Sequence, residues 1–564
     1  MKLNISNGDV TIDSIGEYEI IGSSKVHNIH VNSKATIILD NVDIDVSKES
    51  KAAIDVDKSG NVIISLRGEN KLKSGDNYAG IQMNGKCKVL IKGEENLSSL
   101  NIESGTSAAG IGGGYGDDLD GELIIEGGII NILSTREGAG IGGGNGTIRG
   151  GNLSGNVTIN DGNLNITSGN YGGSGIGGGC SGDLSGEVII NGGKITSVAG
   201  KYGIGAGIGG GYDANLSGKL IINKGEVLAI GGEGASGIGG AINITKGGNL
   251  SGEVIINGGS ITAKGGLYLE KYGGAGIGGG YNGNFSGKLI LNDGEITADK
   301  AGNANDIGGG SNGEITGKVI IKIDKIQVNP TSLDLYIGES KIITSIVTIN
   351  PEVHANISNF EKVKYLSEDT TVATVNKNGL VSAVGKGKTK IIVISMLDET
   401  KSAICSINVS NEIIKIGEID LLIQVNKEEL NIDELENIIC YGNNPIIKDL
   451  YIDENIENFN VDVILPDCKE KVNSIVEYKK ISLYLCITYS IALYTTKACM
   501  ENLKIYALQK SEISSHLEFC LSKDEDFDIN KFKIILNPKY EIDKNYSNKY
   551  YLFKISGTIG LVKN

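Results

Sequence analysis

Three aspartates, Asp117, Asp118 and Asp120, form the densest acidic group in the first half of the chain. Clustered carboxylates cleave polysaccharides when a suitable partner stands beside them, and otherwise they bind calcium or stay solvated. No basic residue lies near this group in sequence, and the chain has only four histidines: His27, His30, His354 and His516. None of them falls between Val31 and Val353, where the repeats described below run. We therefore predict no enzyme activity, no catalytic residue, no metal site and no cofactor.

Three tyrosines, Tyr115, Tyr212 and Tyr281, each stand directly after a run of glycines. Their rings could stack on sugar rings while the hydroxyl groups reach water, so the three are candidate glycan contacts. Other copies of the glycine run are followed by asparagine, cysteine, alanine or serine, and the chain has no tryptophan. The row is therefore interrupted, and exposed tyrosines that only cover a glycine corner remain the alternative interpretation.

The glycine runs are themselves a repeat. Gly-Ile-Gly-Gly or a close variant occurs seven times, starting at Gly110, Gly140, Gly175, Gly207, Gly237, Gly276 and Asp306. Glycine-rich loops hold phosphate when they open a helix and carry a Lys-Ser/Thr pair, and these runs have neither feature. Tight packing at the corner of a repeating coil is the favoured interpretation, because corners need positive φ and close backbone approach.

Each copy continues with Leu-Ser-Gly or an equivalent, a short apolar run, a glycine turn and a second short run, as in 187–198. Such runs are strands, and about thirty residues returning to their start form one coil of a parallel β-helix. Two copies carry a four-residue insertion before Leu153 and Leu250. Weaker copies at Ile81 and Ile54 extend the array towards the N-terminus. An interior ladder is predicted from the isoleucines Ile111, Ile141, Ile176, Ile208, Ile238, Ile277 and Ile307. In repeat style the array resembles carbohydrate-binding β-helix proteins of the bacterial cell surface.

Length and charge indicate a modular protein. The chain has 564 residues and a net charge of −16, which excludes a basic surface for nucleic acid. No segment is apolar over the length needed to span a bilayer, so we predict no membrane insertion. We predict an all-β chain of three domains: a right-handed parallel β-helix over 1–322, an immunoglobulin-like β-sandwich over 323–411 and a β-rich domain over 412–564.

Short alternating strands replace the glycine repeats after Gly317. They include the runs at 326–330, 333–339 and 372–375, then 379–387 and 389–393. Over about 85 residues these runs resemble the group 2 bacterial immunoglobulin-like domain. Tyr365 replaces the tryptophan of that family, and 350–362 is a local insertion. The resemblance implies a rigid spacer or adhesive module without enzyme activity.

The last 150 residues are rich in tyrosine and hold five of the eight cysteines. The cysteines lack Cys-Xaa-Xaa-Cys spacing, and reduced side chains that fill a core are favoured over cross-links. The segment 459–469, then 472–475, 489–494 and 511–521, is similar to the SPOCS-type domain of spore-coat assembly proteins, with 497–502 as an extra segment. That resemblance implies docking or self-assembly in a spore outer layer.

These features together predict a non-enzymatic structural and adhesive protein of a bacterial spore outer layer or appendage. The residues at 1–9 do not form a secretory signal, so the sequence is expected to be made in the cytosol. Its expected partners are further copies or other surface-layer proteins, bound through the C-terminal domain, and a polysaccharide. Two alternatives remain: a phage or phage-like tail protein that binds a host glycan, and a secreted carbohydrate-binding adhesin.

Overall fold

A computed structural model describes the chain except residues 95–97, 147–149, 201, 243–247, 350–352, 355–361, 413, 431–437, 465–470, 497–502, 523–527 and 564. Its described elements are strands and short 3-10 turns, which confirms the predicted all-β class. Two compact units are present. One consists of Met1–Asp324 with Ile349–Glu361, and the other of Lys325–Thr348 with Lys362–Asn564.

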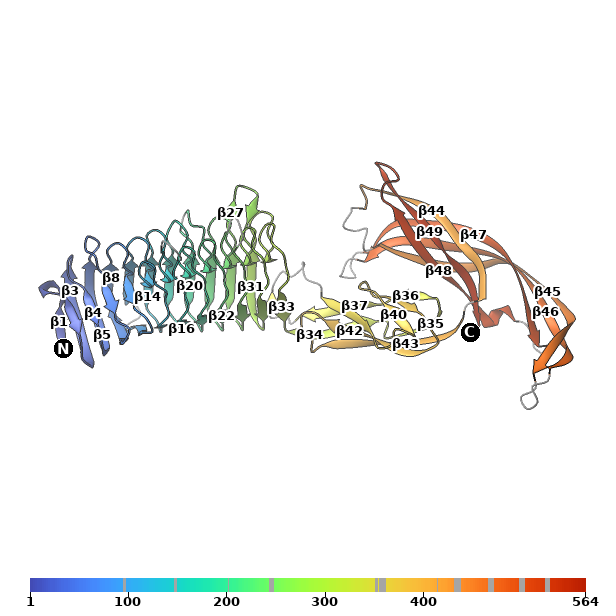
Figure 1. Cartoon of the computed structure of the whole chain (residues 1–564), viewed down its shortest axis with the longest axis horizontal. Coiled ribbons are helices and arrows are strands. Elements are labelled where there is room, and N and C mark those ends of the chain that lie inside the picture. Colours follow the sequence, from blue (N-terminus) through green and yellow to red (C-terminus); the bar gives the residue numbers. More distant parts are fainter. Residues whose placement is uncertain are drawn as a thin grey trace. The chain divides into compact units, whose positions relative to one another are not determined.

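The first unit is a parallel β-solenoid with three strands in each regular coil (Figure 1). The shortest strand of each coil contains the repeated isoleucine or its N-terminal equivalent. These strands are β2 (Val10–Ile12), β4 (Ile29–Val31), β6 (Ile54–Val56), β9 (Ile81–Met83), β12 (Ile111–Gly112), β15 (Ile141–Gly142), β18 (Ile176–Gly177), β21 (Ile208–Gly209), β24 (Ile238–Gly239), β29 (Ile277–Gly278) and β32 (Ile307–Gly308).

The other two strands of each coil lie on either side of a glycine turn and pair in parallel with their equivalents in the neighbouring coils. The first set is β7 (Asn61–Arg67), β10 (Lys88–Gly93), β13 (Glu122–Ile125), β16 (Asn156–Ile159), β19 (Glu187–Ile190), β22 (Lys219–Ile222), β25 (Glu253–Ile256), β30 (Lys288–Leu291) and β33 (Lys318–Ile321). The second set is β8 (Glu69–Lys73), β11 (Ser99–Glu103), β14 (Ile129–Leu133), β17 (Asn163–Thr167), β20 (Lys194–Val198), β23 (Glu226–Ile230), β26 (Ser260–Lys264) and β31 (Gly294–Asp299).

The solenoid begins further towards the N-terminus than the repeats indicate. The first coils are formed by β1 (Lys2–Asn4), the turn η1 (Ile5–Asn7), β3 (Gly16–Ser24) and β5 (Lys34–Asp45), and β5 pairs with both β7 and β8. His27 and His30 therefore lie in the solenoid, in coils that precede the recognised repeats. The glycine signature is absent from these coils, so only the strand pairing shows that they continue the array.

The interior isoleucine ladder is confirmed. Each repeated isoleucine pairs with the next, and all seven are 0–1% exposed. The ladder continues through Ile81, Ile54 and Ile29 to Val10. A second ladder, buried except at its last member, follows the repeated Leu-Ser-Gly and consists of Leu119, Leu153, Leu184, Leu216, Leu250, Phe285 and Ile315. Residues one period apart stack because they occupy the same place in successive coils.

The last coil has an additional strand at its edge. Strand β38 (Val353–His354) pairs in parallel with β31, through Gly294 with Val353 and Glu295 with His354. It belongs to the segment that we interpret as an insertion, and most of that segment lies outside the described residues.

The region after the solenoid is a β-sandwich. One sheet has the order β35 (Ser332–Ile337), β43 (Ser402–Glu412), β42 (Gly387–Ser395), β39 (Val363–Ser367), and the other β36 (Ser340–Ile342), β41 (Leu380–Ala383), β40 (Ala373–Val375). Strands β34 (Ile323–Asn329) and β37 (Thr344–Ile349) form a separate pair. Tyr365 packs against the core, and its hydroxyl lies 2.9 Å from that of Ser345.

The C-terminal region has two antiparallel sheets packed around one apolar core. One sheet has the order β44 (Ile414–Asn426), β49 (Tyr550–Lys563), β48 (Phe532–Asp543), with the turn η3 (Ile529–Lys531) before β48. The other sheet consists of β45 (Ile438–Ile464), β46 (Lys471–Thr496) and β47 (Leu503–Ser522). The apolar runs at 481–485 and 487–494 are parts of one strand. Residues 465–470 and 497–502, which the spore-assembly resemblance includes, lie outside the described residues.

Candidate functional site

The glycine corners are closed by backbone packing. A Cβ added to Gly112 would lie 2.0 Å from the carbonyl oxygen of Gly142, and one added to Gly142 would lie 1.8 Å from that of Gly177. The amide of Gly113 donates to the carbonyl of Gly142 at 2.9 Å, and the same bond recurs between later coils. These amides already have partners, so they offer no phosphate cradle, as the sequence predicts.

At least one carboxylate of the acidic group, that of Asp118, has a structural role. Asp118 Oδ1 accepts the backbone N–H of Asn152 in the next coil at 2.8 Å. The equivalent bond is repeated along the solenoid, always from a side-chain oxygen to the backbone N–H one coil further on: Asn152 to Asp183, Asp183 to Asn215, Asn215 to Asn249, Asn249 to Asn284, and Asn284 to Glu314. We call this row the Asx ladder. Burial, together with Asp118 and Asp120, raises the pKa of the Asp117 carboxyl.

The Asx ladder leads to a prediction for Asp118. Asp118→Asn keeps the oxygen that accepts the N–H of Asn152, so the free energy of unfolding should stay unchanged within about 0.5 kcal/mol. Asp118→Ala removes this acceptor and should cost about 1 kcal/mol. Urea denaturation of the full chain measures both changes. If Asp118→Asn were the more damaging variant, the charge itself would matter, as it would in a catalytic or calcium site.

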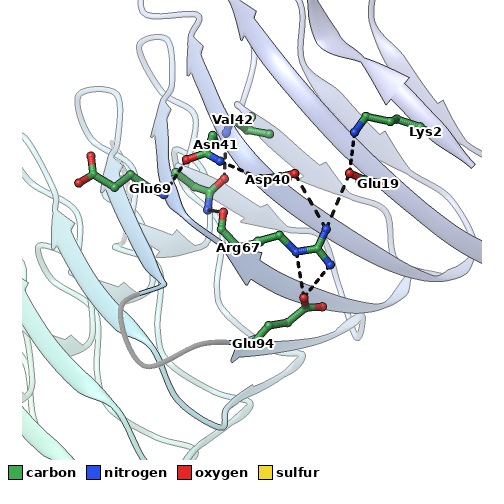
Figure 2. Close-up of polar contacts among 9 residues, drawn as sticks. Lys2, Glu19, Asp40, Asn41, Val42, Arg67, Glu69 and Glu94 are labelled. Atoms are coloured by element: carbon green, nitrogen blue, oxygen red, sulfur yellow. Dashed lines mark hydrogen bonds and ion pairs between the residues drawn. The ribbon is translucent and has the colours of Figure 1, made fainter.

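Arg67 is engaged by carboxylates from several coils (Figure 2). Its Nη2 lies 2.9 Å from Glu94 Oε2, and its Nη1 lies 3.8 Å from Glu19 Oε1 and 3.9 Å from Asp40 Oδ2. The hydrogen bond to Glu94 is the main cause that raises the pKa of Arg67, and Lys2 followed by Arg67 lowers the pKa of the Glu19 carboxyl despite some desolvation. The network joins neighbouring coils, and the lowered pKa of Glu19 is the opposite of what a general acid needs.

The histidines of the first coils also pair with carboxylates. His30 Nδ1 lies 3.0 Å from Asp55 Oδ2, and Asn84 Nδ2 donates to Asp55 Oδ1 at 2.7 Å. His27 Nδ1 lies 3.4 Å from Asp9 Oδ1, which is also bonded to Lys51. His30 and Asp55 are register partners in β4 and β6, so this pair also links two coils.

One of the three predicted glycan contacts, Tyr281, lies in an aromatic cluster. The ring of Tyr281 lies 5.5 Å from that of Tyr268 and 5.1 Å from that of Tyr272, measured between centroids. Tyr268 and Tyr272 belong to the hairpin of β27 (Leu267–Tyr268) and β28 (Tyr272–Gly273), which projects from the stack of coils (Figure 1). Tyr212 holds the same corner position as Tyr281, two coils earlier. Burial raises the pKa of Tyr212, and Asp213, Cys180 and Tyr268 raise it further. We call Tyr268, Tyr272 and Tyr281 the tyrosine cluster.

Tyr115 stands apart from the tyrosine cluster. It holds the same corner position and is 40% exposed, but it belongs to a coil three repeats before that of Tyr212. In the coil between Tyr212 and Tyr281 this position is Ile242, which is 2% exposed. Sequence reasoning missed Tyr268 and Tyr272 because they lie outside the repeat. The signal was present in the longest step of the array, 39 residues from Gly237 to Gly276.

Among the described side chains, no three histidine, cysteine, aspartate or glutamate residues are grouped as metal ligands would be. Five cysteines that the structure describes have free thiols, namely Cys87, Cys180, Cys405, Cys440 and Cys486. Burial raises the pKa of Cys87 to about 12 and that of Cys405 to about 11, so neither is an activated nucleophile. Over the described ranges there is no helix long and apolar enough to cross a membrane.

Comparison with known proteins identifies one module. Residues 322–405 match the family described as the bacterial Ig-like domain (group 2). No curated protein matches the chain. Two solved structures of the surface layer protein SbsC are similar at 13% and 12% identity, covering domains 1–6 and 4–9 of that protein.

The two SbsC matches cover 34% and 45% of this chain, with TM-scores of 0.15 and 0.16. The chain spans only 26% and 32% of those structures, and at these TM-scores neither fold nor function is inferred from them. The chain is therefore a β-solenoid followed by a group 2 bacterial immunoglobulin-like domain and β-rich C-terminal sheets.

Proposed function

We propose that the chain is a non-enzymatic structural protein of a bacterial surface layer, with the solenoid as a projecting rod. The observation that carries this proposal is the Asx ladder, in which side chains suited to chemistry instead bond one coil to the next. A second row of amides does the same at the turns between strands: Asn160, Asn191, Asn223, Asn257 and Asn292. These bonds join each coil to the next and occupy the carboxylate and amide groups that form the two rows.

The C-terminal sheets supply a route to self-assembly. Strand β47 is 20 residues long and lies at one edge of its sheet among the described strands. A long edge strand is a template for pairing with another chain. If two copies of β47 pair antiparallel around Ser511, Lys510 of each copy faces Glu512 of the other. Lys510 and Glu512 are both exposed, so this register places opposite charges together.

The spore outer layer is the setting that we propose for this assembly. Its support is the resemblance of the segment beginning at Phe459 to the spore-assembly domain, together with the immunoglobulin-like module, a type of spacer found in surface proteins. The tyrosine cluster gives specific support to a second candidate, a carbohydrate-binding surface protein.

The test uses spores or filaments of the producing bacterium, viewed by electron microscopy. A variant without residues 412–564 should fail to enter the layer, and one without 1–322 should enter it but lack the outer projection. In the full chain, Lys510→Glu should place like charges opposite each other and weaken incorporation several-fold. Lys377→Glu, the same change at an exposed turn of the immunoglobulin-like domain, is the control. Normal incorporation without 412–564 would contradict the proposal.

A further inference from the structure

The tyrosine cluster is held in place by the next coil. The hairpin that carries Tyr268 and Tyr272 is bonded at its base to Ser311, whose hydroxyl accepts the N–H of Gly273 at 2.9 Å and whose own N–H donates to the carbonyl of Gly273 at 3.0 Å. Ser311 is 1% exposed. The amide of Asn303 also donates to the carbonyl of Lys271 at 3.0 Å. The hairpin is thus a fixed part of the solenoid wall.

The tip of the hairpin is strained and exposed. Leu269 and Glu270 have φ values of 48° and 57°, a conformation that favours glycine or asparagine and that is costly for leucine. Leu267 is 49% exposed and Leu269 is 68% exposed. A tight turn that only closed a coil would place glycine here, as the turns between the main strands do. An apolar side chain held in a strained, exposed turn indicates a surface that is selected for contact.

The rings form a row along the solenoid. Tyr212 and Tyr281 occupy the same corner two coils apart, which is about 10 Å along the axis, because paired strands are spaced by about 4.8 Å. Ile242 holds the corner between them, and Tyr268, the register partner of Tyr272, packs against Tyr281. Lys271 lies 5.4 Å from the centroid of the Tyr272 ring. The ligand that fits a row of this kind is an extended polymer with a repeating apolar face.

We propose that the tyrosine cluster binds a neutral polysaccharide, with the sugar rings stacked on the tyrosines along the axis of the solenoid. Pyranose rings present apolar C–H faces to aromatic rings and hydroxyl groups to their rims, and tyrosine matches both. Among the described residues, those close in sequence to these tyrosines include two acidic side chains, Asp213 and Glu270, and one basic side chain, Lys271, which does not favour an anionic polymer. This site goes beyond the proposed structural role and does not require it.

The experiment is affinity electrophoresis of the full chain in gels that contain hydroxyethylcellulose, glycol chitin or polygalacturonate. We expect a neutral polymer to retard the protein, and Tyr268→Ala and Tyr281→Ala each to raise the dissociation constant at least ten-fold. Tyr281→Phe keeps the ring and should retain binding. Tyr115→Ala is the matched control, because Tyr115 holds the same corner position outside the cluster. Circular dichroism of each variant verifies that the solenoid is intact.

Four results would overturn the proposal. One is that neither neutral polymer retards the wild-type chain. A second is retardation that Tyr268→Ala and Tyr281→Ala leave unchanged. A third is retardation that only polygalacturonate causes. The last is a concentration-dependent dimer that Leu269→Ser abolishes, since this would assign the cluster to a second copy of the chain. The incorporation test of the structural role measures what the C-terminal domain does, whereas the gel assay measures binding at the tyrosine cluster. Either proposal can therefore fail without the other.

Discussion

Ile208→Asp is expected to unfold the coils on both sides of β21. Ile208 is 0% exposed and stacks between Ile176 and Ile238 in the interior ladder. A carboxylate at this place has no partner, and the lost apolar packing adds to its cost. We expect the free energy of unfolding of this segment to fall by about 4 kcal/mol or more, which exceeds most large-to-small core substitutions. Hydrogen exchange measured by mass spectrometry should show loss of protection spreading from Ile208 to its neighbours.

The matched control is Ile221→Asp in the same coil. Ile221 lies in β22, between the buried Leu220 and Ile222, and is itself only half-buried. The same substitution there removes the packing of one outward-facing side chain against its neighbours in the sheet. We expect it to lower the free energy of unfolding by about 1 kcal/mol. Equal effects at Ile208 and Ile221 would contradict the assignment of the two faces, because successive residues of a strand point to opposite sides.

Gly209→Ala is expected to have the second largest effect. Gly209 has a φ of 146°, and a Cβ added there would lie 1.9 Å from the carbonyl oxygen of Gly239. The φ value and the close approach to a carbonyl oxygen are both backbone constraints, so no change of side-chain rotamer relieves them. The coil could accept the methyl group only by moving away from the next coil and breaking corner hydrogen bonds. We expect a loss of about 3 kcal/mol or more, measured by urea denaturation.

Gly258→Ala controls for the general effect of removing a glycine. A Cβ at Gly258 would approach one atom, the carbonyl oxygen of Asn223, at 3.0 Å. The substitution also reduces the freedom of the unfolded chain, which favours folding by up to about 1 kcal/mol. The two effects oppose each other, so Gly258→Ala should be close to neutral. A Gly209→Ala protein as stable as Gly258→Ala would show that the corner is looser than its backbone distances indicate.

The solenoid could be predicted because the same residues recur at the same spacing in successive coils. The offset from Gly-Ile-Gly-Gly to Leu-Ser-Gly fixes two ladders at once, and both are present at Ile208 and Leu216. The same reasoning does not extend to the residue contacts of the coils that precede the repeats. These coils pair like the others without the glycine signature, and no local pattern marks the pairing of His30 with Asp55.

The candidate site was predictable only in part. Tyr281 could be found because it holds a repeated position, whereas Tyr268 and Tyr272 reach it through an inserted hairpin that is bonded to Ser311. The role of Asp118 could not be read from its acidic neighbours, because its partner, the N–H of Asn152, is 34 residues away. Repetition predicts stacking, but it does not predict what an insertion will contact.

The pairing of β38 with β31 bears on the order in which the protein is synthesised. Each coil pairs with the coil made just before it, so the solenoid can grow at the ribosome as the chain emerges. The strand that covers β31 is encoded only after β34 to β37, the first strands of the immunoglobulin-like domain. Until β38 emerges, the start of β31 at Gly294 and Glu295 is an open edge that a neighbouring nascent chain could pair with. Once β38 is translated, these two residues have their partners within the same chain.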